Sequence, residues 1–280
     1  MSSPTSRTWF ITGCSSGLGR AIAEAALLAG DNVQATARKR EDLELLEHLG
    51  AGRCQGHLLD VTDAAQARRV LREAAENAGR IDVLVNNAGY GLVGAVEECT
   101  DDLVRQNFET NFFGTLNVIQ AALPILRGQK SGHLITISAA AAVANYAGFG
   151  IYGAAKAAVE ALHESLRAEL LPHGLKVTLV QPGPFRTDFI RRSLVRAPAM
   201  PEYAGSAGKF ANYLSQVDGK QPGDPERAAE LIVKMVQEGQ SPLRLPLGRY
   251  ITQKIRATAT ARLRELETWE QAACGVDFPS

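Results

Sequence analysis

Short apolar runs recur along the first two-thirds of the chain, separated by longer stretches of mixed polarity. Runs such as VLV at 83–85 and LITI at 134–137 are apolar at nearly every position, which is typical of strands buried on both faces of a sheet. Six strands are predicted in this part of the chain, at residues 8–12, 32–37, 54–58, 81–86, 133–138 and 175–181.

The stretches between these strands have the periodicity or alanine content of helices. Helices are predicted at residues 18–29, 40–49, 63–78, 100–127 and 151–171. Alternating strands and helices indicate parallel βαβ units, and their right-handed crossovers place helices on both faces of one sheet. The predicted fold class is therefore α/β, with a doubly wound, Rossmann-like parallel sheet of about seven strands.

The alternation stops after residue 181. Residues 182–223 are rich in Pro, Gly, Ser and Arg, with one helical segment at 203–216. Long insertions of this kind are usually functional, so we interpret 188–223 as a substrate lid. A helix at 225–238, a strand at 243–245 and a charged helix at 252–273 follow. We interpret 1–280 as a single domain that ends in these C-terminal helices and the last strand, within 224–280.

A glycine-rich segment joins the first predicted strand to the first predicted helix. TGCSSGLG, at 12–19, places glycines where the backbone can approach a pyrophosphate and where a helix N-terminus offers free N–H groups. An ordinary tight turn would also use glycine, but the position at the first strand–helix junction favours dinucleotide binding.

Tyr152 and Lys156 lie four residues apart in a predicted helix, so the phenol and the ammonium share one face. A free tyrosine has a pKa of about 10, and a neighbouring positive charge favours the phenolate and lowers that pKa. The pair is therefore predicted to exchange a proton with a carbonyl or alcohol substrate.

Four motifs together resemble the short-chain dehydrogenase/reductase family: the glycine loop, NNAG at 86–89, YxxxK at 152–156 and PGPFRT at 182–187. The resemblance covers about residues 7–190. TDF and PLRLPLG are similar to the branch with 17β-hydroxysteroid dehydrogenase-like and bacterial ketoreductase sequences. The family implies hydride transfer between a nicotinamide cofactor and a ketone or secondary alcohol. Tyr152 would be the acid/base, Lys156 its pKa modulator and ribose anchor, and Asn111 the holder of a water linking the lysine to solvent.

The resemblance also implies a path for the cofactor. Asp60 and Val61 would flank the adenine, and Phe185 and Thr187 would contact the nicotinamide carboxamide. The implied cofactor-binding residues are Gly13, Ser15, Ser16, Gly17, Leu18, Gly19, Arg38, Asp60, Val61, Asn87, Ala88, Gly89, Tyr152, Lys156, Pro182, Gly183, Phe185 and Thr187.

Charge at the end of the second strand distinguishes the two nicotinamide cofactors. A ribose 2′-hydroxyl prefers a carboxylate, whereas a 2′-phosphate prefers a guanidinium. The strand ends in QATARKR, with Ala37 where an acidic residue would be expected and Arg38 directly after it. We therefore expect NADP(H), although a solvated basic turn would have the same composition.

One member of the family's catalytic group is missing. The family's serine usually precedes the tyrosine by thirteen positions, and that position holds Ala139. Ser138 is present, but adjacent strand residues face opposite ways, so it could replace the missing serine only if the end of the strand bends. Three explanations stay open: an engineered Ser→Ala variant, an enzyme that works without the hydroxyl or acts on a C=N bond, and an NADP(H)-binding sensor or scaffold with little turnover.

The residues around this gap also suggest the substrate. Family position places five residues in the substrate pocket, namely Ala139, Ala141, Tyr146, Phe149 and Pro184. Small and aromatic side chains together predict a bulky, mostly hydrophobic ketone or alcohol.

The amino-acid composition limits the partners and the location that are expected for this protein. Thirty basic and thirty acidic residues cancel, so neither nucleic acid nor an anionic membrane is expected to bind. No window approaches the roughly 20 apolar residues of a membrane span, and four scattered cysteines indicate reduced thiols in a cytoplasmic protein. A dimer or tetramer through helices 100–127 and 151–171 stays open.

The five histidines have no metal-type partners in the sequence, and no metal is predicted. His48, His133, His163 and His173 are expected at the surface, and His57 at a strand edge.

Overall fold

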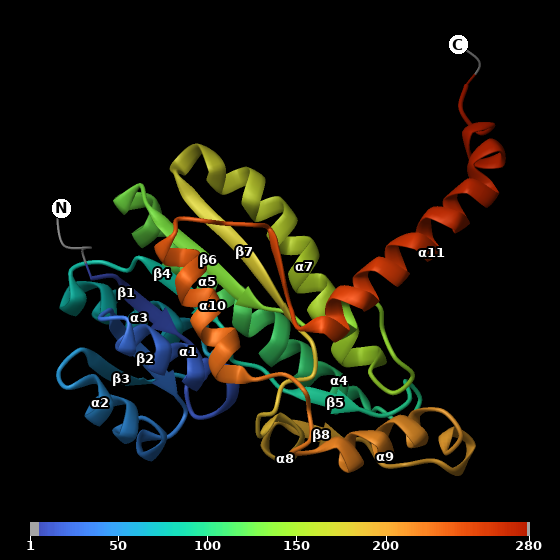
Figure 1. Ribbon diagram of the computed structural model, residues 1–280, viewed down its shortest axis with the longest axis horizontal. Helices are drawn as coiled ribbons and strands as arrows, with labels where there is room; N and C mark the ends of the chain where they lie inside the picture. Colours follow the sequence, from blue (N-terminus) through green and yellow to red (C-terminus); the bar gives the residue numbers. More distant parts are fainter. Residues whose placement is uncertain (1–5, 279–280) are drawn as a thin grey trace.

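The structure is a computed structural model that describes residues 6–278, built around a seven-stranded sheet (Figure 1). All strands pair in parallel, in the order β3-β2-β1-β4-β6-β7-β9. The strands are β1 (Thr8–Ile11), β2 (Asn32–Ala37), β3 (Cys54–Leu58), β4 (Val83–Asn86), β6 (Gly132–Ile137), β7 (Leu175–Pro182) and β9 (Arg244–Leu247). The predicted doubly wound α/β fold is confirmed.

Helices cover both faces of the sheet because its strands are apolar on both sides. In β1, Trp9 and Ile11 pack into one core with helices α1 (Gly17–Leu28), α2 (Glu44–Gly50) and α10 (Pro225–Gln237). Phe10 lies in the opposite core, together with α3 (Ala64–Ala78), α5 (Gly114–Gln129) and α7 (Gly150–Leu170).

The strand order changes direction between β1 and β4, because the chain first builds outward to β3 and then returns to build the other half. Ligands of such sheets bind outside the carboxyl ends of the strands at this switch point. The glycine loop after β1, Asn87 after β4, Ser138 after β6 and Gly183 after β7 all follow carboxyl ends at this edge.

The predicted helix at 100–127 is helical but not uniform. It consists of α4 (Asp101–Phe108), a π-helical turn η2 (Glu109–Phe113) and α5. Single π-helical turns are rare and often occur at functional sites. Asn111 lies inside this turn.

Several short elements were not predicted. Strands β5 (Gly91–Val93) and β8 (Leu194–Arg196) form a separate two-stranded sheet. The predicted lid holds α8 (Phe189–Arg192), η4 (Pro201–Tyr203) and α9 (Ala207–Val217), of which α9 corresponds to the predicted helical segment at 203–216. The remaining short helices are η1 (Arg40–Asp42), α6 (Ala140–Val143) and η3 (Leu171–His173). Three- and four-residue elements carry too little periodicity to be seen in the sequence.

The last helix, α11 (Arg249–Cys274), begins beside α6 and β9 and then extends away from the body of the molecule (Figure 1). Its buried residue is Ile251. None of the helices within residues 6–278 combines the length and the apolar character needed to cross a bilayer.

Candidate active site

The glycine loop is fixed by contacts to the segment after β4. Gly13 and Gly17 have φ angles of +72° and +62°, a region that residues with a Cβ atom rarely adopt. A Cβ atom on Gly19 would lie 2.2 Å from Nδ2 of Asn87. That amide donates hydrogen bonds of 3.0 Å to the carbonyl oxygens of Thr12 and Gly13. The two loops therefore form one rigid unit.

The N-terminus of α1 opens from this unit toward a cavity. No side chain caps the helix, and its first turn contains no acidic residue. Its free N–H groups and positive dipole end are suited to an anionic group such as a pyrophosphate. Thr187 lies opposite, since a Cβ atom on Gly17 would be 3.6 Å from the Thr187 Cβ atom. These features fit a dinucleotide whose phosphates lie on the glycine loop.

The predicted adenine end lies at the carboxyl ends of β2 and β3. Arg38 is exposed directly after β2, and within residues 6–278 it forms no ion pair, whereas Lys39 faces Glu41 at 3.9 Å. Val61 is buried and packs against Gly114 of α5. The Asp60 carboxylate accepts hydrogen bonds from the backbone N–H and hydroxyl of Thr62. Asp60 therefore stabilises the turn in which it lies.

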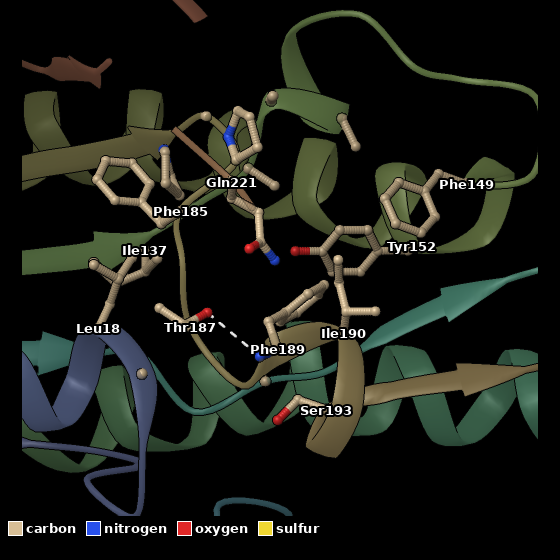
Figure 2. Close-up of a pocket in the computed structure, with 18 of the residues that line it drawn as sticks. Leu18, Ile137, Phe149, Tyr152, Phe185, Thr187, Phe189, Ile190, Ser193 and Gln221 are labelled. Atoms are coloured by element: carbon tan, nitrogen blue, oxygen red, sulfur yellow. Dashed lines mark hydrogen bonds between the residues drawn. The ribbon is translucent and has the colours of Figure 1, made fainter. Parts of the chain in front are cut away.

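Tyr152 lies in the first turn of α7, and its ring is packed between aromatic neighbours while its hydroxyl points toward the cavity (Figure 2). The ring centroids of Phe149 and Phe189 are 5.2 and 6.1 Å away. One helical turn further on, the Lys156 ammonium donates a 3.0 Å hydrogen bond to the carbonyl oxygen of Ile137. α7 thus places the phenol and the amine at one wall of the cavity.

Burial determines the proton affinities of this pair. It raises the pKa of Tyr152 above its ordinary value and lowers the pKa of Lys156 to about 8, because both charged forms lose water. In the protein on its own the pKa of Tyr152 is therefore raised, not lowered as expected, because desolvation outweighs the effect of the Lys156 charge. Lys156 is directed at Ile137, and desolvation of the phenol dominates. Tyr152 is protonated at neutral pH and able to donate a proton.

Asn111 lies close to Lys156 across Gly89. A Cβ atom on Gly89 would be 2.6 Å from Asn111 Oδ1 and 3.4 Å from Lys156 Nζ. The Asn111 side-chain NH₂ group donates to the carbonyl oxygens of Tyr90 (2.9 Å) and Asn107 (3.0 Å). The fully buried amide therefore ties η2 to the segment after β4. The expected bridging water remains a proposal.

Ala139 packs beside Tyr152, in a cluster with Val93 and Phe149. Ser138, one residue earlier, is buried, and its hydroxyl donates a 2.7 Å hydrogen bond to the carboxylate of Glu160, two turns beyond Tyr152 on α7. Gln181 also donates to this carboxylate. The position next to Tyr152 thus has no side-chain hydroxyl, and the nearest serine is engaged elsewhere.

A cavity of about 290 Å³ connects the glycine loop with Tyr152. It brings together all five predicted substrate residues and many predicted cofactor residues. The cofactor residues in its lining are Ser16, Gly17, Leu18, Asn87, Ala88, Gly89, Tyr152, Lys156, Pro182, Gly183, Phe185 and Thr187. The other predicted cofactor residues, Gly13, Ser15, Gly19, Arg38, Asp60 and Val61, lie outside this lining.

The sequence predicted a substrate lid at 188–223 but identified neither its lining residues nor the contribution of α11. The wall formed by the lid and by α11 comprises Phe189, Ile190, Ser193, Phe210, Tyr213, Leu214, Val217, Gln221 and Tyr250. The spacing of Phe210, Tyr213, Leu214 and Val217 is the stripe of an amphipathic helix and could have identified α9 as a wall. Gln221 carried no such signal.

The mouth of the cavity has a polar contact between two tyrosines. The hydroxyls of Tyr146 and Tyr250 are 2.7 Å apart, and the Lys254 ammonium lies 3.4 Å from the centroid of the Tyr146 ring. The first turns of α11 therefore close one side of the substrate region. Within residues 6–278 no group of three or more His, Cys, Asp or Glu side chains is arranged to hold a metal ion.

Comparison with known proteins agrees with this geometry. The sequence profile of the short chain dehydrogenases matches residues 7–196. The chain belongs to this family. It is 40% identical over 243 residues to oxidoreductase BOA17 of Botryotinia fuckeliana, covering 86% of this chain and 89% of that protein. As a member of the family, the chain is an oxidoreductase.

Two further relatives have named substrates. A 3-ketodihydrosphingosine reductase of Bacteroides thetaiotaomicron is 34% identical over 242 residues, covering 85% of this chain and 86% of that protein. Human retinol dehydrogenase 8 is 33% identical over 256 residues, covering 85% and 80%.

Solved structures match the whole fold. A short-chain dehydrogenase from Streptomyces avermitilis has a TM-score of 0.92 at 40% identity and covers 98% of this chain and 100% of its own. A Burkholderia phymatum relative in complex with NAD has a TM-score of 0.80 at 25% identity, covering 91% and 94%. A serine dehydrogenase with NADP⁺ has a TM-score of 0.74 at 27% identity, covering 86% and 94%.

Proposed function

We propose that this oxidoreductase interconverts a ketone and a secondary alcohol with NADP(H), using Tyr152 as acid and base. The proposal depends mainly on the Tyr152 hydroxyl, which faces a largely apolar cavity that continues to the open N-terminus of α1. A proton donor and a site for a dinucleotide therefore border the same cavity.

When bound, a nicotinamide would supply the hydride for this reaction. The glycine loop would hold the phosphates, and Lys156 the adjoining ribose. In the reductive direction the protonated phenol of Tyr152 donates its proton to the oxygen of the substrate, and in the oxidative direction the phenolate accepts it. Positive charge on Lys156, one turn away, favours the phenolate formed after donation.

The preference for NADP(H) rests on charge at the end of β2. Ala37 offers no carboxylate, and the exposed Arg38 guanidinium is not engaged by an acidic residue within residues 6–278. A guanidinium can grip a 2′-phosphate through two parallel hydrogen bonds. One structural neighbour was solved with NAD and another with NADP⁺, so these neighbours support either cofactor.

Arg38→Ala should weaken NADPH binding at least tenfold and change NADH binding by less than twofold, because the 2′-phosphate distinguishes the two ligands. Isothermal titration of both cofactors measures the two dissociation constants. Lys39→Ala is the matched control, since Lys39 already faces Glu41. An unchanged NADPH/NADH ratio in Arg38→Ala would contradict the assignment.

The substrate is expected to be bulky and mostly apolar. Aromatic and aliphatic side chains from α7, α8 and α9 dominate the substrate half of the cavity. Such walls bury hydrophobic area at about 25 cal/mol per Å². Relatives named for 3-ketodihydrosphingosine and for retinol are consistent with such a substrate.

Ala139 favours a second candidate, an NADP(H)-binding protein with little turnover or a reductase of C=N bonds. Loss of one neutral donor to a developing oxyanion can cost about 100-fold in rate. This alternative predicts tight NADPH binding without ketone reduction.

The deciding experiment follows NADPH absorbance with a panel of apolar ketones and cyclic imines. The wild-type chain should reduce at least one ketone, and Tyr152→Phe should lose at least 100-fold in kcat with its NADPH Kd nearly unchanged, because only the proton donor is removed. Ketone inactivity of both the wild type and Ala139→Ser would exclude the proposal. Imine reduction alone would favour the C=N reductase, and NADPH binding without any turnover the sensor.

A further inference from the structure

The side chain of Gln221, in the cavity wall, has no hydrogen-bond partner within residues 6–278. Gln221 follows α9 at the end of the lid segment and is 4% exposed, although its neighbours Lys220 and Pro222 are exposed. Its side-chain oxygen is buried and accepts no hydrogen bond within residues 6–278. Its amide group points toward the hydroxyl of Tyr152 (Figure 2).

The backbone around Gln221 is anchored to the loop after β7. Arg186 donates a 3.2 Å hydrogen bond from Nε to the Gln221 carbonyl oxygen, and its own N–H bonds to the Gly223 carbonyl at 2.9 Å. Gly223 in turn donates to Pro184 at 3.1 Å. Gln221 is thus held against the PGPFRT segment.

The buried, unpaired oxygen of Gln221 is an acceptor, whereas the NH₂ group beside it is the part of the amide directed into the cavity, toward Tyr152. A donor in a cavity wall that makes no hydrogen bond within residues 6–278 is available to a ligand. The Gln221 side chain faces the space in front of the Tyr152 hydroxyl, where the carbonyl of a substrate would lie.

Reduction of a ketone builds negative charge on the substrate oxygen, and that charge needs hydrogen-bond donors. Tyr152 supplies one donor. Ala139 supplies none, and the hydroxyl of Ser138 is bonded to Glu160. A side-chain amide is a neutral donor that needs no change of protonation state.

We propose that the Gln221 side-chain NH₂ group donates a hydrogen bond to the carbonyl oxygen of the substrate, beside Tyr152, and so supplies the contact that Ala139 cannot make. This inference rests on the proposed function. The proton that completes the alcohol still comes from Tyr152, and Gln221 only orients the carbonyl and stabilises the developing charge.

The test compares Gln221→Ala, Gln221→Glu and the exposed control Gln216→Ala with the wild type. At saturating NADPH, Gln221→Ala should lower kcat/KM for the best ketone by about 100-fold. Gln221→Glu has the same shape but no donor when ionised, so its kcat/KM should fall at least as far. NADPH Kd and melting temperature should stay unchanged, and Gln216→Ala should match the wild type.

Ala139→Ser provides the second half of the test. In the Gln221→Ala background, Ala139→Ser should raise kcat/KM at least tenfold. In the wild type, the same substitution should raise kcat/KM by less than threefold. A Gln221→Ala variant with weaker NADPH binding and normal kcat/KM would assign the amide to the cofactor and overturn the inference. Undiminished turnover in Gln221→Ala would overturn it without touching the proposed function. Ketone inactivity of the wild type alone would overturn this inference, and ketone inactivity of both the wild type and Ala139→Ser would refute the proposed function as well.

A separate observation concerns α11. The part of this helix that extends from the body carries three exposed apolar side chains, Leu263, Leu266 and Trp269, which are 55%, 57% and 68% exposed. Their spacing of three residues places them on one side of the helix. An apolar stripe on a projecting helix is normally covered by a partner.

Charge along α11 indicates which partner. Residues 249–264 contain five basic and no acidic residues, and residues 265–274 contain three acidic and no basic residues. Two copies of the helix in antiparallel orientation would place each basic half against an acidic half. A parallel pair would place like charges together. Antiparallel pairing is also the symmetric, self-complementary arrangement of a twofold dimer.

We infer that two copies of this chain pair through α11 in antiparallel orientation, with Leu263, Leu266 and Trp269 at the seam. At 1.5 Å per residue the 26-residue helix is about 39 Å long. The seam would therefore extend over several helical turns outside the catalytic body.

Light scattering after size exclusion tests the pairing. The wild type should be a dimer in low salt, and both E265K/E267K/E270K and R256E/R262E/R264E should be monomers. A mixture of the two variants should form a heterodimer, because opposite charges then face each other along the projecting part of the helix. A monomeric wild type, or variants that stay dimeric, would overturn the inference. Binding of monomeric wild type to phosphatidylcholine vesicles, lost in W269A, would instead assign the stripe to a lipid surface.

Discussion

Ser138 and Ala139 are adjacent in the chain and have different surroundings. Ala139 packs beside Tyr152, whereas the hydroxyl of Ser138 bonds to a carboxylate shared with Gln181 and Arg244. A buried carboxylate is tolerated only when hydrogen bonds and opposite charge compensate it. The serine therefore belongs to a network that joins β6, β7, β9 and α7.

Ser138→Ala is expected to lower the free energy of unfolding by about 1–3 kcal/mol, because it removes one donor from the buried carboxylate of Glu160. Turnover per folded molecule should change by less than twofold. Urea unfolding and initial rates measure the two quantities, and Ser215→Ala, at an exposed position outside the cavity lining, is the control for loss of a hydroxyl. A large loss of turnover with unchanged stability would instead place Ser138 in the catalytic group.

At the scale of elements, α11 consists of two parts. Its first turns contribute Ile251 to the core and Tyr250 to the cavity, and Lys254 lies over the ring of Tyr146. From Ala259 to Phe278 every residue is exposed. The first part belongs to the site, and the second part contributes nothing to the core.

Removal of residues 259–280 should therefore leave the fold intact. Exposed positions without contacts usually change stability by less than about 0.5 kcal/mol each, so we expect the melting temperature of the folded body to shift by no more than about 4 °C. Differential scanning calorimetry at a concentration where the full chain is monomeric makes the comparison. A drop of more than 10 °C would mean that this part of α11 stabilises the body.

At the scale of the whole molecule, the two cores contain buried histidines. The expectation that His133 and His163 lie at the surface is wrong: they are 4% and 0% exposed. His163 donates from Nδ1 to the Val159 carbonyl, so its Nε2 accepts from the hydroxyl of Thr136. Burial lowers the pKa of each histidine to about 4. Both are therefore neutral in the folded protein at physiological pH.

These histidines should make the fold sensitive to acid. In the unfolded chain a histidine binds a proton below about pH 6.5, whereas the folded protein resists protonation until about pH 4. Unfolding therefore takes up protons between these values, and stability should fall as the pH drops from 6.5 to 4, by at most about 3 kcal/mol for each histidine.

Urea midpoints at pH 7.5, 6, 5 and 4 measure this effect. His163→Gln should show a flatter dependence on pH than the wild type, and His173→Gln, an exposed position, should follow the wild type. Equal slopes in all three proteins would mean that His163 does not contribute to the acid sensitivity.

The sequence alone determined the order of strands and helices, the family, and the positions of the glycine loop, Tyr152 and Lys156. Each of these predictions depends on residues that are close together in the sequence. The patterns are apolar runs, glycine at a strand–helix junction, and two residues one helical turn apart. The short strands β5 and β8 were missed because a run of three residues is too short to show the alternation of apolar and polar residues that identifies a strand.

Only the tertiary structure determined the contacts between segments that are far apart in the sequence. The side-chain partner of Ser138, the burial of His163 and the inward direction of Gln221 depend on elements 20 or more residues away. The proton affinities of Tyr152 and Lys156 also follow from their removal from water rather than from their spacing. Desolvation and long-range hydrogen bonds have no local sequence pattern, because they arise only when the chain is packed.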